Sequence, residues 1–554
     1  MQVEVFGKPS DLESLRESWD RIYERDPEAH FFVSRTHLSR YMRLFDGAWF
    51  ILAARPTADS EYVALFPLRL RTRMDAKTGH FYNEINMAGN YASDYTGLIC
   101  DPRFAEPAIV AFAKYLKNMH WARIHLENIR MSEARLRLLM AQFSGASFGI
   151  QEISRVNKID NVDNRKCVSI DLPASWEAYL EGNLGSNTRQ KLRRFLRKVE
   201  GSQEFRIATA DETTIARDVE ILLQLWRQKW GERKGRRLPV ILSHSRKVMR
   251  DNFESGSLFM PILWQGDKPI GALAIFVDPV KKAMLFFMAA RDESVTNLPV
   301  GLILHGYSIR HAIEQGFKTY DFLRGDEPYK YAFGVKESTI YCGQLYTRTG
   351  LNLGNQLDAR SLGGVLKKAT EYHKAGRFEA AKAAYLQILQ VDPNHRRTLY
   401  QLAQVLTKSG AHRQAAEVLE KLCALSPASV KIWLRLGFVL KAAGRFAEAI
   451  SAFEKAMQLS PGLTIAKFGI GQSLLQQWRV DEAAAEFRSI LRQPATNVND
   501  RVLRKGAWLL LQKLTRDEPS IIPQSDHLNR NIAQLKSSAW TALRSPAPLA
   551  TARR

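Results

Sequence analysis

The densest group of reactive side chains lies at 320–334, where the sequence YDFLRGDEPYKYAFG holds two Asp, one Glu, one Arg, one Lys and three Tyr. Its first residues are predicted to form a strand, which puts Asp321 and Leu323 on one side. The other side would carry Tyr320, Phe322 and Arg324. Carboxylates can remove a proton, and tyrosines or cations can stabilise a developing negative charge. The composition therefore indicates acid–base chemistry.

A turn is predicted directly after this strand. Gly325 lets the chain bend, which places Asp326 at the C-terminal end of the strand. Pro328 then fixes the loop that carries Tyr329 and Lys330. The elements around this stretch must position these groups.

Length and composition limit the class of protein. At 554 residues the chain exceeds a single core, so roughly three domains of about 150 residues are expected. The formal net charge of +23 predicts attraction to an anionic partner such as a phosphate, a nucleic acid, an acidic protein surface or a membrane surface. The four cysteines are scattered without a Cys-x-x-Cys pair, which argues against a disulfide scaffold and a zinc site, and we expect no metal.

Neither a signal peptide nor a membrane span is expected. The N-terminal sequence MQVEVFGKPSDLESL has early acidic residues and lacks an apolar stretch. The most apolar run, AMLFFMAA at 283–290, is too short to cross a bilayer. We therefore expect a cytoplasmic protein without a transmembrane segment.

The C-terminal part of the chain is periodic. Glycines recur every 34 residues, at Gly376, Gly410 and Gly444. Prolines recur with the same step, at Pro393, Pro427 and Pro461. Small and large apolar residues keep this period, so each unit is predicted to be two short amphipathic helices with the glycine at the turn between them. The fourth unit has Trp478 where glycine is expected.

This pattern resembles the tetratricopeptide repeat family over residues 362–493, with roughly four units. The resemblance implies an all-α solenoid whose concave groove takes a protein or peptide partner. The following tail, 515–554, is rich in Pro, Ser and Arg and is predicted to be a partly disordered basic segment.

The first 350 residues alternate between strand and helix patterns. Apolar or alternating runs at 3–7, 49–55, 62–73 and 121–129 predict strands, and helical periodicity appears at 11–26 and 107–119. A similar order returns after residue 160, with an apolar central strand at 282–291 and an amphipathic helix at 300–316. Two mixed α/β halves are predicted.

Several of these segments resemble the CelD-type acetyltransferases, which belong to the GNAT superfamily and were named for an association with cellulose biosynthesis. The segments are SNTRQKLRRFLRKVE, PIGALAIFVD and the stretch from KAMLFFMAAR through YKYAFG, together with HFFVSRTHL, VALFPLRLR and SDYTGLI in the opening half. The resemblance implies a tandem GNAT-like α/β region with halves at 1–160 and 161–347. The Fem-type peptidoglycan aminoacyltransferases, which use aminoacyl-tRNA, share this arrangement.

In the GNAT fold an acyl-CoA enters where two central strands splay apart, and its pyrophosphate rests on helix N-terminal amides, where the helix dipole favours an anion. The resemblance therefore implies acetyl-CoA or another acyl-CoA as co-substrate. The matching positions between strand 282–291 and the next helix are Asn297, Val300, Gly301 and Leu302. Pro299 removes one amide there, and an ordinary helix start is the alternative interpretation.

Transfer of an acyl group to an amine needs a base for the amine proton and a donor for the oxyanion. We predict Asp326 as the base, with Asp321 as the alternative, and Tyr329 as the donor to the thiolate or the oxyanion. Arg324 and Lys330 are predicted to bind substrate anions or to pair with these acids. A structural Arg–Asp pair that joins the strand to its neighbour is the other interpretation.

A basic helix is predicted at 188–200. Arg189, Arg193 and Arg194 could hold an anionic acceptor, although a solvated helix face explains them equally well. His305, one turn inside the helix at 300–316, is predicted to be a packed or surface residue.

Three functions remain open at this stage. The first is an N-acyltransferase acting on an amino sugar, a polysaccharide precursor or a protein amine, docked on a partner through its repeats. The second is an inactive GNAT-fold scaffold that works through the repeats. The third is an aminoacyl-tRNA-dependent transferase, which the basic charge would suit because phosphate contacts dominate nucleic-acid affinity.

Overall fold

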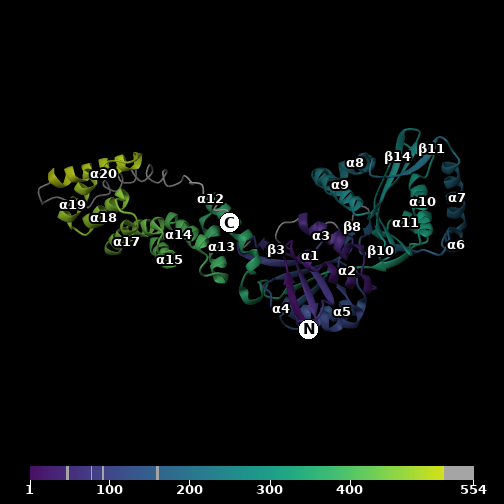
Figure 1. The fold of residues 1–554 in the computed structure, drawn as a ribbon, viewed down its shortest axis with the longest axis horizontal. Helices are drawn as coiled ribbons and strands as arrows, with labels where there is room; N and C mark the ends of the chain where they lie inside the picture. Colours follow the sequence, from purple (N-terminus) through teal and green to yellow (C-terminus); the bar gives the residue numbers. More distant parts are fainter. Residues whose placement is uncertain (45–48, 77, 90–92, 158–160, 517–554) are drawn as a thin grey trace. The chain divides into compact units, whose positions relative to one another are not determined.

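The structure is a computed structural model, and it describes residues 1–44, 49–76, 78–89, 93–157 and 161–516. The chain separates into two compact units, one built mainly from Met1–Asp75 with Phe81–Ser361 and the other from Leu362 onward. The first unit contains two mixed sheets covered by helices, and the second consists of helices (Figure 1).

The first sheet has eight strands in the order β1-β2-β3-β4-β6-β18-β7, with β5 paired to β3. Its strands are β1 (Gln2–Phe6), β2 (Trp49–Arg55), β3 (Ala64–Met74), β4 (Phe81–Met87), β5 (Ile99–Cys100), β6 (Arg123–Ile129), β7 (Phe148–Glu152) and β18 (Tyr341–Thr347). Its helices are α1 (Asp11–Ser14), α2 (Arg16–Arg25), α3 (Arg35–Leu44), α4 (Ala105–Lys117) and α5 (Glu133–Ala141).

Both faces of this sheet are buried, which explains the continuous apolar sequence of β2. Phe50 and Leu52 pack on the side of α4 and α5. Trp49 and Ile51 alternate with them and pack on the side of α1 to α3. The helix predicted at 11–26 is observed as two helices, because the chain leaves regular helix geometry at Leu15.

The second sheet also has eight strands, in the order β11-β13-β14-β15-β16-β10-β17, with β12 paired to β14. Its strands are β10 (Lys166–Asp171), β11 (Phe205–Thr209), β12 (Leu258–Phe259), β13 (Pro261–Gln265), β14 (Lys268–Asp278), β15 (Ala283–Arg291), β16 (Thr319–Arg324) and β17 (Lys336–Thr339). Its helices are α6 (Trp176–Gly182), α7 (Ser186–Glu200), α8 (Ile215–Lys234), α9 (Leu238–Glu254), α10 (Val300–Glu314) and α11 (Pro328–Tyr331). A small hairpin, β8 (Val156–Asn157) with β9 (Val162–Asp163), precedes it.

Helices cover this sheet on both sides (Figure 1). Leu273 and Ile275 of β14 pack in the same core layer as residues of α7 and α10. Ala272 and Ala274, which alternate with them, pack in the layer of α8 and α9. The predicted mixed α/β architecture is confirmed.

Two consecutive strands near the end of the α/β region belong to different sheets. β17 belongs to the second sheet, whereas β18, which follows it directly, pairs with β6 and β7 of the first. A further apolar cluster contains residues of both halves, including Phe31 and Phe32 from the first and Phe276 and Leu323 from the second. The halves therefore form one packed unit.

The second unit consists of paired helices, as the 34-residue period predicts. The helices are α12 (Leu362–Lys374), α13 (Phe378–Val391), α14 (Arg396–Lys408), α15 (His412–Leu425), α16 (Val430–Ala442), α17 (Phe446–Leu459), α18 (Thr464–Gln476), α19 (Val480–Arg492) and α20 (Val498–Arg516). The repeated Gly376, Gly410 and Gly444 have φ of 75°, 80° and 79°, the left-handed geometry that ends a helix. Trp478 adopts φ 63° at the matching position of the fourth unit.

The predicted all-α repeat is thus confirmed, and α20 follows its fourth helix pair. Most of the predicted basic tail, 517–554, lies outside the described residues. Among the helices that the structure describes, none is both long and apolar enough to cross a membrane.

Candidate functional site

The strands β15 and β16 separate soon after they begin. They pair in parallel at only three positions, Ala283 with Thr319, Met284 with Tyr320, and Leu285 with Asp321. β15 continues to Arg291, and a bulge in its pairing with β14 leaves Phe287 as an extra residue. Because α10 connects the two strands, its N-terminus lies at the end where they diverge.

The start of α10 presents backbone amides. The Val300 amide donates to the Leu298 carbonyl at 2.9 Å, while the amides of Gly301 and Leu302 have no acceptor among the described residues. Leu298 and Val300 are buried and anchor the turn, and Asn297 is exposed. The first turn carries no acidic residue, so its positive dipole end is not neutralised there.

Close packing fixes this helix. A Cβ at Gly306 would lie 2.3 Å from Leu192 Cδ1, so α10 approaches α7 closely. Further along both helices, Arg310 forms an ion pair with Glu200. The order of these contacts shows that α7 and α10 run in the same direction, and their N-termini therefore lie at the same end.

The three predicted anion-binding arginines of α7 differ in their contacts. Arg193 pairs with Glu177 and Glu181, and the Arg194 guanidinium lies 4.5 Å above the Phe195 ring. Arg189 is half-buried in the first turn of α7, and its guanidinium makes no hydrogen bond or ion pair with any described residue. Of the three, it is the one left available at the shared end of α7 and α10.

An aromatic cluster surrounds His305 between the separating strands. The imidazole centroid lies 4.7 Å from that of Phe286 on β15 and 5.0 Å from that of Phe322 on β16. Its Nδ1 is 3.0 Å from the Tyr320 hydroxyl oxygen. Burial, with the nearby charge of Lys330, lowers the pKa of His305 to about 3, so the ring is neutral at physiological pH. His305 is a packed residue, as predicted.

Tyr329 lies at the edge of this cluster. Its ring centroid is 6.3 Å from that of His305, and 48% of the residue is exposed. About half of the residue is thus accessible where the strands diverge, while burial and the charge of Glu327 raise the pKa of its hydroxyl, so Tyr329 is protonated at neutral pH. The loop position of Tyr329 is visible in the sequence, but no local pattern associates it with His305.

Lys330 holds the loop from inside. Its Nζ donates to the carbonyls of Arg324 at 2.8 Å and Gly325 at 3.1 Å, and it lies 2.8 Å from a Glu327 carboxylate oxygen. The residue is 2% exposed. These contacts stabilise the turn at Gly325, whose φ of 98° favours glycine.

Asp321 faces the first half of the unit. Its carboxylate accepts hydrogen bonds from the Tyr95 hydroxyl at 2.9 Å, from Arg130 Nη1 at 2.6 Å and from the Leu323 amide at 2.7 Å. The Arg130 guanidinium also lies 4.4 Å above the Tyr95 ring. Burial and the charge of Asp321 raise the pKa of Tyr95 well above its ordinary value.

The side chains of β16 were predicted to alternate strictly between its two sides, and this prediction is wrong at its last residue, Arg324. Leu323 has φ 60°, and the pairing of β16 with β10 is irregular beside it. Arg324 consequently reaches Asp94 of the first half, with Nε 2.6 Å from Oδ1, next to the Tyr95 that contacts Asp321. The sequence left open an Arg–Asp pair to a neighbouring strand, and the observed pair instead joins β16 to the first half.

Asp326 lies apart from both groups. It accepts a hydrogen bond from the Asp163 amide at 2.7 Å and lies 3.6 Å from Lys166 Nζ. Its side chain is 20% exposed. The predicted site residues therefore fall into three places, around α10, at the contact with the first half, and beside β9 and β10.

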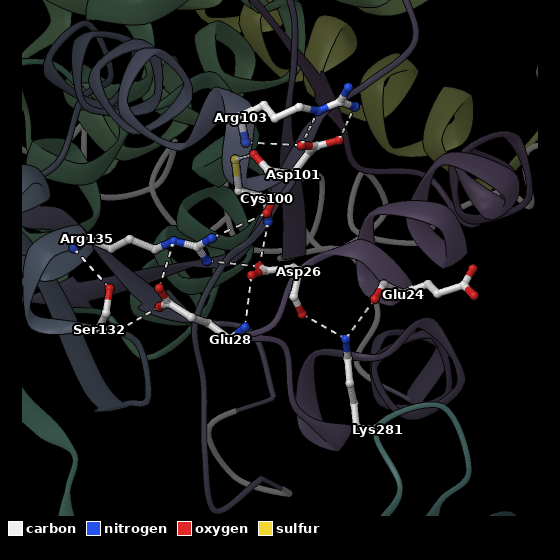
Figure 2. A network of polar contacts seen from close by, with 9 residues as sticks. All are labelled: Glu24, Asp26, Glu28, Cys100, Asp101, Arg103, Ser132, Arg135 and Lys281. Atoms are coloured by element: carbon white, nitrogen blue, oxygen red, sulfur yellow. Dashed lines mark hydrogen bonds and ion pairs between the residues drawn. The ribbon is translucent and has the colours of Figure 1, made fainter.

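A second polar network joins the halves (Figure 2). The buried Asp26 carboxylate accepts from the Cys100 amide at 2.8 Å and from Arg135 Nη1 at 2.9 Å. Lys281, from the loop before β15, donates to the carbonyls of Asp26 at 2.8 Å and Glu24 at 3.1 Å. This network fixes the start of β15 against the first half.

The structure offers two buried cysteines near these contacts, and neither suits nucleophilic catalysis. Burial raises the pKa of Cys100 and of Cys167 to about 12, so both thiols are protonated at neutral pH.

Residues that sequence reasoning did not select include Arg130, Asp26 and Lys281. Arg130 directly follows the strand predicted at 121–129, and a cation at the C-terminal end of a strand was the available signal. Asp26 and Lys281 carry no motif and become visible only through their contacts.

Comparison with known proteins assigns the class of these regions. Residues 186–331, from α7 through α11, match the family model described as an acetyltransferase (GNAT) domain. Residues 366–430 and 440–500 match models described as tetratricopeptide repeats. The chain thus contains an acyltransferase domain of the GNAT class followed by tetratricopeptide repeats. A GNAT domain implies an acyl-CoA co-substrate, and the repeats suggest protein partners.

Solved structures give weaker similarities. A crystal structure of FemX is 11% identical, covering 63% of this chain and 97% of that chain, with a TM-score of 0.42. MamA of AMB-1 is 26% identical over 24% of this chain and 73% of that chain, with a TM-score of 0.23. MamA from Desulfovibrio magneticus RS-1 is 20% identical over 28% and 78% of the two chains, with a TM-score of 0.22. None of the curated proteins compared with the chain matches it.

Proposed function

We propose that this protein is an N-acyltransferase that moves an acyl group, with acetyl the first candidate, from coenzyme A to an amine. The acceptor would be an amino sugar, a polysaccharide precursor or a protein amine, and the repeats would dock the enzyme on a protein partner. The observation that carries the proposal is the early separation of β15 and β16 beside an unneutralised helix N-terminus.

The start of α10 suits the pyrophosphate of an acyl-CoA. The amides of Gly301 and Leu302 are free to donate, and no heavy atom comes within 4 Å of a Cβ built on Gly301. Arg189 would add a positive charge from the neighbouring helix. Leu298 and Val300 would support the turn without touching the ligand, because both are buried.

In the transfer step, the amine nitrogen attacks the thioester carbonyl, a C–N bond forms and the C–S bond breaks. The amine must lose a proton, and the departing thiolate must gain one. We assign the donor role to Tyr329, because it is protonated at neutral pH, half exposed and beside the diverging strands. The neutral His305 would position this ring.

Asp326 is our candidate base, since its carboxylate is partly exposed and is held in place by the Asp163 amide and Lys166. Asp321 is the weaker candidate because Tyr95 and Arg130 occupy its oxygens. The Arg324 guanidinium would orient the acceptor from the side of Asp94, and Lys330 would keep the loop in place.

The test is calorimetric titration of acetyl-CoA, longer acyl-CoAs and free CoA into the wild type and the Gly301→Asp variant. The new carboxylate has room, and an acidic residue in the first turn favours the helix by about 0.3–1 kcal/mol, so the variant should fold. It should nevertheless repel the pyrophosphate and weaken binding by about tenfold or more.

Gly363→Asp is the matched control. Gly363 also occupies the second position of a helix, α12, and a Cβ there has no heavy atom within 4 Å. Binding unchanged in the control but lost in Gly301→Asp supports the site. Equal binding in all three proteins would contradict a pyrophosphate site at the start of α10. Absence of binding to any CoA would favour the scaffold or tRNA-dependent alternatives.

A further inference from the structure

Acidic residues are distributed unevenly between the two helices of the second, third and fourth repeat units. The sequences of the first helices α14, α16 and α18 contain no Asp or Glu. They contain seven basic residues: Arg396, Arg397, Lys408, Lys431, Arg435, Lys441 and Lys467. Every second helix from α13 to α19 carries at least one acidic residue, such as Glu379, Glu420, Glu448 and Glu482.

Side chains of successive first helices contact one another. Lys431 Nζ and the Arg435 guanidinium of α16 lie 5.4 Å and 4.9 Å from the ring centroid of Tyr400 on α14. Lys408 Nζ of α14 lies 3.3 Å from Nε2 of His373 on α12. The polar and aromatic groups of these helices therefore form a continuous surface, here called the first-helix strip.

The strip continues into the fourth unit. Lys441 of α16 donates to the amide oxygen of Gln472 on α18. The aromatic residues Phe438 on α16 and Phe468 on α18 are both partly exposed. The strip thus carries cations, an amide and aromatic rings, groups that recognise carboxylates, peptide groups and apolar side chains respectively.

We propose that the first-helix strip binds an acidic, extended segment of a partner protein. This deepens the proposed docking role of the repeats and rests on it. The positive charge on the strip and the acidic residues on the second helices would confine a negatively charged segment to one surface. The chain's own tail does not meet this requirement, because 517–554 contains three acidic and five basic residues.

A nucleic acid fits the strip less well than an acidic peptide. Single strands gain affinity by stacking bases on free aromatic faces. Arg435 and Lys431 lie over the Tyr400 ring, and Lys441 Nζ lies 5.6 Å from the centroid of Phe438. Cations therefore already lie over the Tyr400 and Phe438 rings, where bases would stack.

The experiment measures fluorescence anisotropy of a labelled peptide of about twelve residues, rich in Glu and Asp with interspersed Leu and Phe, added to the full chain. The test variant is Arg397→Glu with Lys431→Glu, two exposed residues of the strip. The control is Lys421→Glu with Lys455→Glu, two exposed residues of the second helices α15 and α17. Both double variants change the net charge equally.

We expect the peptide to bind the wild type and the control within about twofold of each other, and to bind the strip variant about tenfold more weakly. Affinity should also fall as salt rises. A peptide with Lys and Arg in place of the acids should not compete. Absence of binding, or equal loss in both double variants, would overturn the proposal.

A labelled oligothymidylate of similar length tests the remaining alternative, in which the strip binds a nucleic acid. Tighter binding of this strand than of the acidic peptide, with the same loss in the strip variant, would identify a nucleic-acid surface and overturn the proposal. Acetyl-CoA titration of the same preparations distinguishes a failure of this proposal from a failure of the acyltransferase function, because the strip variants leave α10 unchanged.

Discussion

The role of Asp321 can be tested by Asp321→Asn. The substitution keeps the shape of the side chain and an oxygen that can accept from Tyr95 and the Leu323 amide, but it removes the charge opposite Arg130. Breaking a fully buried ion pair costs about 3–5 kcal/mol. Because the Arg130 side chain is 35% exposed, water can take over part of the interaction, and we expect a loss of about 2 kcal/mol.

The loss would appear as a fall of roughly 2–3 °C in the apparent Tm, because the unfolding entropy of about 2.1 cal/mol/K per residue is summed over a unit of about 350 residues. It can be measured by differential scanning calorimetry of the full chain, following the transition of the α/β unit. Acetyl-CoA affinity below that transition should stay within about twofold of the wild type, because Asp321 lies on the side of β16 opposite His305.

Asp326→Asn is the matched control for this prediction. Its carboxylate is 20% exposed and lies 3.6 Å from Lys166, so its loss should cost less than about 1 kcal/mol. Acyl transfer should instead be slowed, as expected for a base. An unchanged Tm in Asp321→Asn together with a large fall in the Tm of Asp326→Asn would refute the structural role of Asp321 and the catalytic role of Asp326.

Three further perturbations test the packing and the pKa arguments. Asp26→Ala should cost about 3–5 kcal/mol in urea unfolding, because it leaves the buried Arg135 without its closest carboxylate; loss below about 1 kcal/mol would contradict this. Gly306→Ala should cost about 1–3 kcal/mol by crowding Leu192, and combining it with Leu192→Ala should cost less than the sum of the single losses; strict additivity would contradict the contact. Burial lowers the pKa of His305 to about 3, so between pH 6.5 and about 3 the unfolded chain binds a proton there that the folded chain does not. Stability should therefore fall as pH falls below 6.5, by up to about 1.4 kcal/mol per pH unit, and His305→Gln should flatten this dependence; identical slopes for both proteins would contradict it.

Local sequence signals predicted the elements that depend on neighbouring residues. The 34-residue spacing of Gly376, Gly410 and Gly444 placed the helix turns because only a residue that tolerates positive φ ends these helices easily. The apolar runs of the central strands were visible because both faces of each sheet are covered. Regularity of this kind is set within a few residues and can be predicted from one sequence.

Contacts between the halves could not be predicted in the same way. Asp321 meets Tyr95 and Arg130, which are 226 and 191 residues away, and no local pattern links them. The left-handed backbone at Leu323, which turns Arg324 toward Asp94, also goes against the preference of a branched side chain. Such geometry is imposed by the docking of one half on the other.

The central claim is that the start of α10 holds the pyrophosphate of an acyl-CoA. Hydrogen exchange measured by mass spectrometry on the peptide covering 297–304, with and without saturating acetyl-CoA, tests it most directly. We predict slower exchange in this peptide, because the amides of Gly301 and Leu302, which have no acceptor among the described residues, would donate to the ligand. Unchanged exchange here, with protection elsewhere in the second half, would contradict the claim.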